Sequence, residues 1–371
     1  MELKKYKLGE CLELQRGYDL TSSQMQGGEV EVVGSNGIIG YHNSERGNSP
    51  CITVGRSGSV GKVHYYEQPT WAHNTALFIK DFKGNNPKYL YYLLKNLHLD
   101  NIFEKGSSVI PSLDRKLVHS LVVPFHKDIN DQRKVVDVLS AIDRKIELNK
   151  QINDNLEAMA KQLYDYWFVQ FDFPNEEGKP YKSSGGAMVW NEKLKRELPK
   201  GWDFCFLENL LTIKNGRDHK HLADGIYPVY GSGGEMRKAS EYLYDGESVL
   251  MPRKGSLNNI MYVNEAFWTV DTMFYSEIKQ SNCAKYIYYT IKDIDFTRWD
   301  SGTGVPSMTS STLYSIKLVK PQSEILKKFD EVISPLFEHM KQISEQNSVL
   351  TKQRDELLPL LMNGQASVTS D

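Results

Sequence analysis

The sequence predicts an α+β protein with two similar β-rich domains, each followed by a long helix, and with the two helices paired as an antiparallel coiled coil. Two observations lead to this pseudo-twofold arrangement. A series of turns and a tryptophan segment occurs twice in the same order, about 197 residues apart. Each series is followed by a segment in which apolar residues recur every seven positions, the spacing of a coiled-coil seam. The length of 371 residues also favours at least two hydrophobic cores.

The repeated unit is a β-rich domain, predicted over residues 1–127 and again over residues 201–321. Its matched segments are the glycine turns 34–37 and 231–234, the basic turns 54–58 and 251–255, and the tryptophan segments 71–75 and 268–272. Short β-type runs bounded by glycine turns are predicted at residues 30–33, 38–41, 51–54, 63–66 and 76–79. One helix is expected at residues 87–94 of the first copy and at residues 284–291 of the second.

Two long helices are predicted at residues 128–173 and 322–363. Because they lie in one chain and are separated by a β-rich domain, we expect them to pair within the molecule, with the domains at opposite ends. The second helix should kink at Pro335 and end near Pro359. The residues predicted to pair the helices are Val135, Ile142, Ile152, Leu156 and Leu163 in the first, and Phe329, Leu336, Ile343, Leu350 and Leu357 in the second.

The seam of the first helix is predicted to contain polar positions as well. Its second heptad register runs through Val138, Ile152, Met159 and Tyr166 and includes Lys145. Asn149 interrupts the first register. A buried polar residue on such a seam costs stability but can fix the register against a single partner helix.

Two further segments carry little apolar patterning. Residues 174–200 are turn-rich and polar, which predicts an extended connector and a domain boundary. Residues 364–371 are predicted to form a disordered tail.

Composition limits the setting in which the protein works. The four cysteines, at positions 11, 51, 205 and 283, lack CxxC spacing, so we expect free thiols in a reducing cytoplasm. No run approaches the roughly 20 apolar residues that a membrane span needs, and we expect no contact with a membrane. The net charge of −2 means that any surface for nucleic acid must be local.

The motifs of common enzymes are not found in the sequence. Residues 55–63 superficially resemble a phosphate-binding loop, but the spacing is one residue too long and Val63 stands where Ser or Thr would bind magnesium. His219 and His221 have no companion residues for zinc. We therefore predict no catalytic residue, no metal site and no cofactor bound by this chain.

The duplicated turns supply candidate recognition residues instead. An arginine on a tight turn can reach phosphate or bind guanine through two hydrogen bonds, and glycine turns allow close approach of the backbone to a ligand. The candidate DNA-binding residues are Ser35, Asn36, Arg56, Ser57 and Lys62 in the first copy, and Ser232, Gly233, Arg253 and Lys254 in the second. Ordinary β-turns with solvated charges would show the same residues. Trp71 and Trp268 fit core positions better than base-stacking platforms.

With this layout, the chain closely resembles the specificity (S) subunit of type I restriction-modification systems, over essentially its whole length. The most specific stretches are residues 132–136 and 163–174 of the first helix and its exit, and residues 197–202 at the end of the connector. The turns at residues 109–113 and 305–308 fit the exits of the family's target-recognition domains.

The resemblance implies a DNA reader without catalytic chemistry of its own. Each domain would recognise one half of a split, asymmetric sequence in double-stranded DNA, and the helices would fix the spacing between the halves. Two methyltransferase (M) subunits would carry S-adenosylmethionine to an adenine, which would be flipped out of the duplex for N6 methylation. Two restriction (R) subunits would join for cleavage. The alternative is a protein-binding coiled-coil scaffold with duplicated ligand-binding domains, which would not bind duplex DNA.

Overall fold

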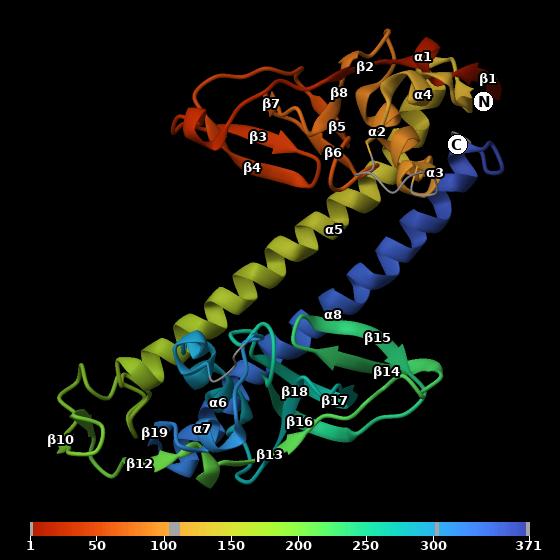
Figure 1. Ribbon diagram of the computed structural model, residues 1–371. Coiled ribbons are helices and arrows are strands. Elements are labelled where there is room, and N and C mark those ends of the chain that lie inside the picture. The colour runs from red at the N-terminus through yellow and green to blue at the C-terminus, as the bar shows by residue number, and fades with distance from the viewer. Residues whose placement is uncertain (1–2, 104–111, 301–303, 369–371) are drawn as a thin grey trace. The chain divides into compact units, whose positions relative to one another are not determined.

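The computed structural model describes residues 3–103, 112–300 and 304–368 (Figure 1). It contains two compact units. The first comprises Met1–Gln151 and Ser344–Asp371, and the second comprises Ile152–Ile343. Each unit therefore consists of one predicted β-rich domain together with one part of each long helix.

The first unit confirms every β run predicted for it. A four-stranded sheet has the order β2-β8-β5-β6, a three-stranded sheet has the order β4-β3-β7, and β1 pairs with β9. The elements are β1 (Leu3–Lys7), α1 (Leu8–Cys11), β2 (Glu13–Arg16), β3 (Val30–Gly34), β4 (Gly37–His42), β5 (Cys51–Gly55), β6 (Val63–Tyr66), β7 (Trp71–Ala72), β8 (Ala76–Asp81), α2 (Pro87–Asn96), α3 (Leu99–Phe103), α4 (Arg115–Ser120) and β9 (Val122–His126).

The second unit repeats this topology. Strands β13-β18-β16-β17 correspond to β2-β8-β5-β6, and the order continues through β14 and β15, which correspond to β3 and β4. In both units this hairpin joins a parallel partner at the tryptophan segment. The elements are β12 (Asp203–Phe206), β13 (Leu211–Asn215), β14 (Asp224–Gly231), β15 (Gly234–Ala239), β16 (Tyr244–Pro252), β17 (Met261–Thr269), β18 (Met273–Ile278), α6 (Ala284–Lys292), α7 (Ser310–Tyr314) and β19 (Lys317–Lys320).

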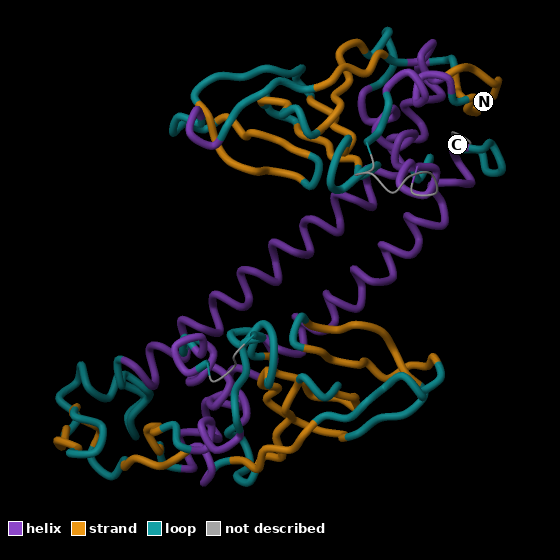
Figure 2. The backbone as a smooth tube through the Cα atoms, viewed as in Figure 1, coloured by secondary structure: helices purple, strands orange, loops and turns teal. Residues whose placement is uncertain are grey.

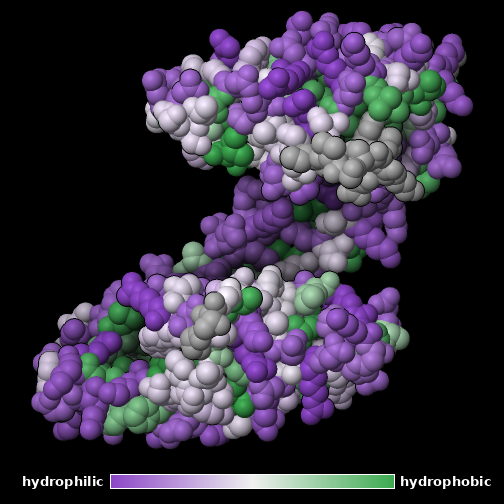
Figure 3. All heavy atoms as spheres, viewed as in Figure 1, coloured by the Kyte–Doolittle hydropathy of each residue, from purple (hydrophilic) through white to green (hydrophobic). Residues whose placement is uncertain are grey.

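The short helices lie beside the strands in each unit (Figure 2). Helix α2 begins at Pro87, and the side chain of Asn86 accepts a hydrogen bond from Tyr89 N, which satisfies a free backbone donor. Trp71 and Trp268 are buried, and each indole donates to a backbone carbonyl. Their predicted role as core residues is confirmed. On the faces visible in Figure 3, hydrophilic side chains cover most of both units.

The long helices are α5 (Ile129–Tyr164) and α8 (Ser323–Met362). Helix α5 is followed by a wider, π-type turn over Asp165–Val169, so the helical stretch is shorter than the predicted end at residue 173. Phe171 then takes a left-handed conformation, with φ of 64°, which is incompatible with a continuing helix. Helix α8 ends close to Pro359, as predicted. At Pro335, where the sequence predicted a kink, the helix is not interrupted.

The two helices run antiparallel within each unit. In the first, Arg354 Nη1 donates to Asp143 Oδ1 at 3.0 Å, and Asn149 Nδ2 donates to Asn347 Oδ1 at 2.8 Å. In the second, the rings of Trp167 and Phe329 lie 5.6 Å apart. Asn153 Nδ2 contacts the carbonyl of Met340. Residue numbers rise along α5 as they fall along α8, so the predicted direction of pairing is confirmed.

The ten residues predicted to pair the helices are all buried or half-buried. The second heptad register predicted for the first helix is wrong, because Met159 is 54% exposed and Lys145 is also exposed. The seam runs one position later, through residues that are at most 8% exposed: Leu139, Ile146, Ala160 and Trp167. Asn149 is on the seam and is 1% exposed, whereas the predicted polar interruption at Lys145 does not exist.

The predicted connector at residues 174–200 is folded, not extended. The hairpin β10 (Met188–Asn191) and β11 (Arg196–Pro199) occupies its second half. Before it, the ring of Phe173 stacks on Trp202 with centroids 4.8 Å apart and on Tyr181 at 4.7 Å. These aromatic contacts bind the connector to the core of the second unit.

The predicted disorder of residues 364–371 is wrong for the part that the structure describes. The chain turns at Gly364, and Ala366 and Val368 pack against the core of the first unit. Residues 369–371 lie outside the described residues.

The four cysteines are free and buried. In the described chain, no helix is long and apolar enough to cross a membrane. Charged side chains are buried mainly where they are paired. Lys285 on α6 is 4% exposed, and its Nζ lies 2.8 Å from Glu247 Oε1 and 2.9 Å from Asp330 Oδ1. The counterpart of Lys285 in the first unit, Lys88, forms an exposed pair with Glu67.

Replacement of Lys285 by alanine should lower the free energy of unfolding of the second unit by about 3 kcal/mol, because two carboxylates lose their shared buried cation. The matched change Lys88→Ala should cost less than about 1 kcal/mol, since its ion pair is exposed to solvent. Urea denaturation followed by circular dichroism measures both. Equal losses for the two variants would contradict this difference in burial.

Candidate nucleic-acid interface

In the first unit, the glycine turn and the basic turn meet at Thr75. Its backbone carbonyl accepts hydrogen bonds from Arg56 N at 2.9 Å and Ser57 N at 3.1 Å. Its hydroxyl accepts from Ser35 N at 3.3 Å. The basic turn after β5 and the glycine turn between β3 and β4 are therefore held side by side, although about 20 residues separate them in sequence. We call these two turns the tips of a unit.

The second unit has the same arrangement. The carbonyl of Thr272 accepts from Arg253 N at 2.8 Å and from Lys254 N at 3.2 Å. Here the glycine turn is held by Asn259, whose Nδ2 donates to the carbonyl of Ser232 at 2.9 Å. The two units thus share the backbone contacts of the basic turn and differ in the side chain that holds the glycine turn.

The exit segments complete the support of the basic turns. Leu113 N donates to the carbonyl of Arg56 at 2.8 Å, and Met308 N donates to the carbonyl of Arg253 at 2.9 Å. Isolated bridges pair Ser57 with Ser112 and Lys254 with Ser307. Much of the first predicted exit, at residues 109–111, lies outside the described residues.

Hydrogen bonds fix the backbone of each basic turn, and the arginine side chain on the turn remains free to bind a ligand. In the described parts of the chain, no salt bridge involves the guanidinium of Arg56 or Arg253. Arg237 differs, because it donates to Asp224 and to the carbonyls of His219 and Leu222. Two unpaired guanidinium groups on fixed turns are suited to bind an anion or a base edge.

The nine candidate residues gather in two groups, one in each unit. None is buried: Asn36, Lys62, Gly233 and Lys254 are exposed, and Ser35, Arg56, Ser57, Ser232 and Arg253 are half-buried. Lys62 Nζ donates to Asn36 Oδ1 at 2.7 Å, which joins a basic group to the glycine turn of the first unit. The structure therefore brings together residues that the sequence identified only as separate turns.

Glycine is required where the two turns approach each other. A Cβ atom on Gly55 would lie 1.9 Å from the carbonyl oxygen of Ser59 and 2.9 Å from that of Ser35. In the second unit, Gly255 has φ of 89°, and a Cβ there would lie 2.8 Å from Ser232 Oγ. No other residue allows the same close approach without a shift of the backbone.

Two hollows flank the tips of the second unit. One, of about 540 Å³, lies beside Ser232 and is lined in part by Lys220, Asp218 and Asp271. The other, of about 250 Å³, lies between Arg253, Lys254 and the exit segment. The first hollow is lined by two aspartates and one lysine, so this surface presents hydrogen-bond donors and acceptors and not a uniform positive charge.

Sequence reasoning missed the residues that support the tips. Thr75 and Thr272 were visible only as the last position of the repeated tryptophan segments. His64 contacts the backbone of Ser35, and burial lowers the pKa of its ring, which keeps it neutral at pH 7. Asn259 lies outside the repeated segments, and no sequence pattern indicated it.

The fold and these groups define a class of protein: a duplicated scaffold that presents one pair of polar and basic tips on each unit. Within the described residues, no three metal-binding side chains gather at one place. The family model described as type I restriction modification DNA specificity domain matches residues 1–158 and 199–347. The chain belongs to this family, as its sequence predicted.

Individual relatives agree with this membership. The chain is 28% identical over 340 residues to the type I restriction enzyme MjaIX specificity subunit of Methanocaldococcus jannaschii, which covers 83% of this chain and 76% of the relative. It is 22% identical to the HindI specificity subunit of Haemophilus influenzae, over 75% of this chain and 77% of the relative. A crystal structure of an S subunit from M. genitalium has the same fold, with a TM-score of 0.63 at 18% identity, covering 99% of this chain and 97% of that one.

The change Gly55→Ala should destabilise the first unit by about 1–3 kcal/mol, because the new methyl group would overlap backbone oxygens that cannot move away. The control is Gly27→Ala, since a Cβ at Gly27 meets nothing within 4 Å. Thermal denaturation monitors both variants. An unchanged midpoint for Gly55→Ala would mean that the two tips are not in close contact.

Proposed function

We propose that this chain is the DNA-specificity subunit of a type I restriction-modification complex, and that each unit reads one half of a split, asymmetric target. One observation carries the proposal: the same backbone contacts hold the basic turn in both units, while the side chains on the turn differ. Arg56 and Ser57 in the first unit correspond to Arg253 and Lys254 in the second. Equal scaffolds with unequal tips suit the recognition of two different half-sites.

The chemistry of the tips fits base and phosphate contacts. An arginine can donate two hydrogen bonds to guanine in the major groove, and an asparagine can pair with adenine in the same way. Arg56 and Asn36 lie in one group and could read adjacent bases. Lys254 and Lys62 are exposed point charges that suit phosphate.

Catalysis belongs to the partners in this proposal. Two methyltransferase subunits would bind the chain and supply S-adenosylmethionine for N6 methylation of an adenine in each half-site. Two restriction subunits would bind where the system also cleaves DNA. The chain would act on double-stranded DNA in the cytoplasm and would itself bind no cofactor.

Sequencing of methylated adenines in cells that express the chain with its cognate methyltransferase tests the proposal. We expect one bipartite motif with a fixed spacer. Arg56→Ala should relax one half of the motif and Arg253→Ala the other, at a cost of about 1–3 kcal/mol in binding if each contact is to a base.

Lys193→Ala is the control, because Lys193 is an exposed cation remote from the tips in sequence. It should leave both halves of the motif intact. An equal loss of methylation at all sequences in the arginine variants would indicate phosphate contacts only. If the wild-type complex methylated no defined sequence and the chain failed to bind duplex DNA at low salt, the scaffold alternative would replace the proposal.

The spacer should follow the length of the helices. Deletion of residues 146–152 from α5 together with residues 344–350 from α8 removes one heptad from each helix and takes Asn149 away with its partners. At a rise of 1.5 Å per residue this shortens the pair by about 10 Å, close to three base pairs of DNA. The methylated motif should therefore lose about three unread positions, and a matched heptad insertion should add about three. An unchanged spacer in both variants would refute a ruler function of the helices.

A further inference from the structure

The two units differ at the place where a β-strand, a short helix and a long helix meet. In the second unit, this place is filled by Phe337 of α8. Its ring lies 4.8 Å from the ring of Tyr262, 6.2 Å from that of Tyr288 and 6.0 Å from that of Tyr289. Three tyrosines from β17 and α6 therefore surround one phenyl group.

The first unit has the same three tyrosines but no phenyl group. Tyr65 on β6 and Tyr91 and Tyr92 on α2 correspond in position to those of the second unit. On α5, the residue that matches Phe337 is Asp143, because each lies eight positions after the fully buried first seam residue, Val135 or Phe329.

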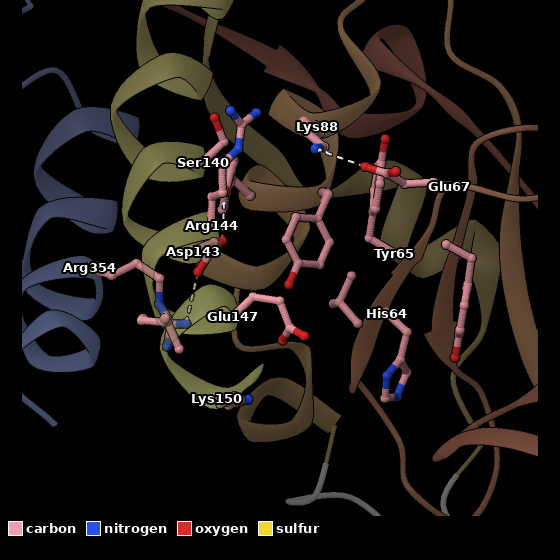
Figure 4. A pocket seen from close by; sticks show the side chains of 15 residues that line it. His64, Tyr65, Glu67, Lys88, Ser140, Asp143, Arg144, Glu147, Lys150 and Arg354 are labelled. Atoms are coloured by element: carbon pink, nitrogen blue, oxygen red, sulfur yellow. Dashed lines mark hydrogen bonds and ion pairs between the residues drawn. The ribbon is translucent and has the colours of Figure 1, made fainter. Parts of the chain in front are cut away.

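Asp143 does not fill the space in the first unit that corresponds to the position of the Phe337 ring. Its Oδ2 accepts from the hydroxyl of Tyr92 at 2.6 Å, and its Oδ1 accepts from Arg354 at 3.0 Å. Burial, with the neighbouring carboxylate, raises the pKa of Tyr92, so the hydroxyl remains the donor. The carboxylate is held by α2 and α8, and a hollow of about 960 Å³ remains between β6, α2 and α5 (Figure 4).

The β6 and α2 side of this hollow is aromatic and the α5 side is mostly polar, with two cations at the rim that form no salt bridge to a described residue. Glu67 pairs with Lys88, and Asp143 pairs with Arg354. Among the described residues, no salt bridge involves Arg144 or Lys150, which line the hollow from α5 and are exposed. Of the acids in the lining, only Glu147 has no cation of its own, and it accepts a hydrogen bond from Gln151. Arg144 and Lys150 together outweigh Glu147 by one charge, so the rim favours carboxylates.

We propose that this hollow is a docking pocket for an aromatic side chain of a partner protein, flanked in that partner by acidic residues. Phe337 indicates the ring that fits the tyrosine walls, and Arg144 with Lys150 indicates the charge beside it. In the second unit, the ring of Phe337 occupies the corresponding place. This inference rests on the proposed function, whose methyltransferase subunit is the partner to test: one copy would gain an anchor on the first unit that the other copy does not have.

The test measures binding of the cognate methyltransferase to the full chain by isothermal titration calorimetry, with native mass spectrometry to count bound copies. Asp143→Phe would fill the pocket from within. Because it also removes the contacts of Asp143 with Tyr92 and Arg354, the double variant Arg144→Glu/Lys150→Glu tests the rim without changing a buried group. Lys145→Glu is the matched control, since Lys145 is exposed on the same helix and does not line the hollow.

Wild-type chain and the Lys145→Glu control should bind two methyltransferase copies. The pocket and rim variants should retain one copy and lose at least tenfold in affinity for the other, with duplex DNA binding unchanged. Two copies bound with unchanged affinity would overturn the pocket but leave the proposed function intact. Loss of DNA affinity with intact methyltransferase binding would assign the rim to phosphate and would also overturn it. Failure of the wild-type chain to bind the methyltransferase would contradict both.

Discussion

The structure of each candidate recognition surface depends on one interaction, the pair of hydrogen bonds that the backbone of a basic turn donates to a threonine carbonyl. Thr75 and Thr272 occupy equivalent places, directly before the strands β8 and β18. Each threonine directly precedes the buried first residues of a strand, so its carbonyl cannot move far and fixes the turn that donates to it. The arginine side chains then project from a rigid base, so little conformational entropy of the backbone would be lost on binding of the proposed ligand.

The strands and the two long helices could be predicted because short-range patterns determine them, and the direction of helix pairing followed from the β-rich domain that separates the helices. Glycine turns bounded each β run, and heptad spacing identified the helices. The second seam register could not be predicted, because apolar residues occur at both possible positions: Val138 precedes Leu139, and Met159 precedes Ala160. Spacings of three and four residues are both compatible with a helix, and only packing against α8 selects between them. The prediction of an extended connector was wrong for a different reason. The connector is held by stacking of Phe173 on Trp202, a contact between residues far apart in sequence that the local polarity of the segment does not reveal.

Much of the candidate interface was visible as well, through repetition. The tips were identified because Arg56 and Arg253 recur at the same place in two copies. Their neighbours were not, because His64 and Asn259 act on the glycine turn through contacts specific to one unit. When a residue has a role in only one of the two copies, comparison of the copies does not identify it. The open hollow beside Asp143 is of the same kind: it is defined by a difference, and only the geometry of both units reveals it.

The division of the chain between the units has a consequence for synthesis. The second unit is one continuous stretch, Ile152–Ile343, whereas the first combines Met1–Gln151 with Ser344–Asp371. Leu358, Leu361 and Met362 belong to the core of the first unit, so that core cannot be finished until these residues, which follow the second unit, have been translated. A ribosome would release the second unit's full sequence while the first still lacked part of its interior. The unit that begins to emerge first is therefore the one completed last.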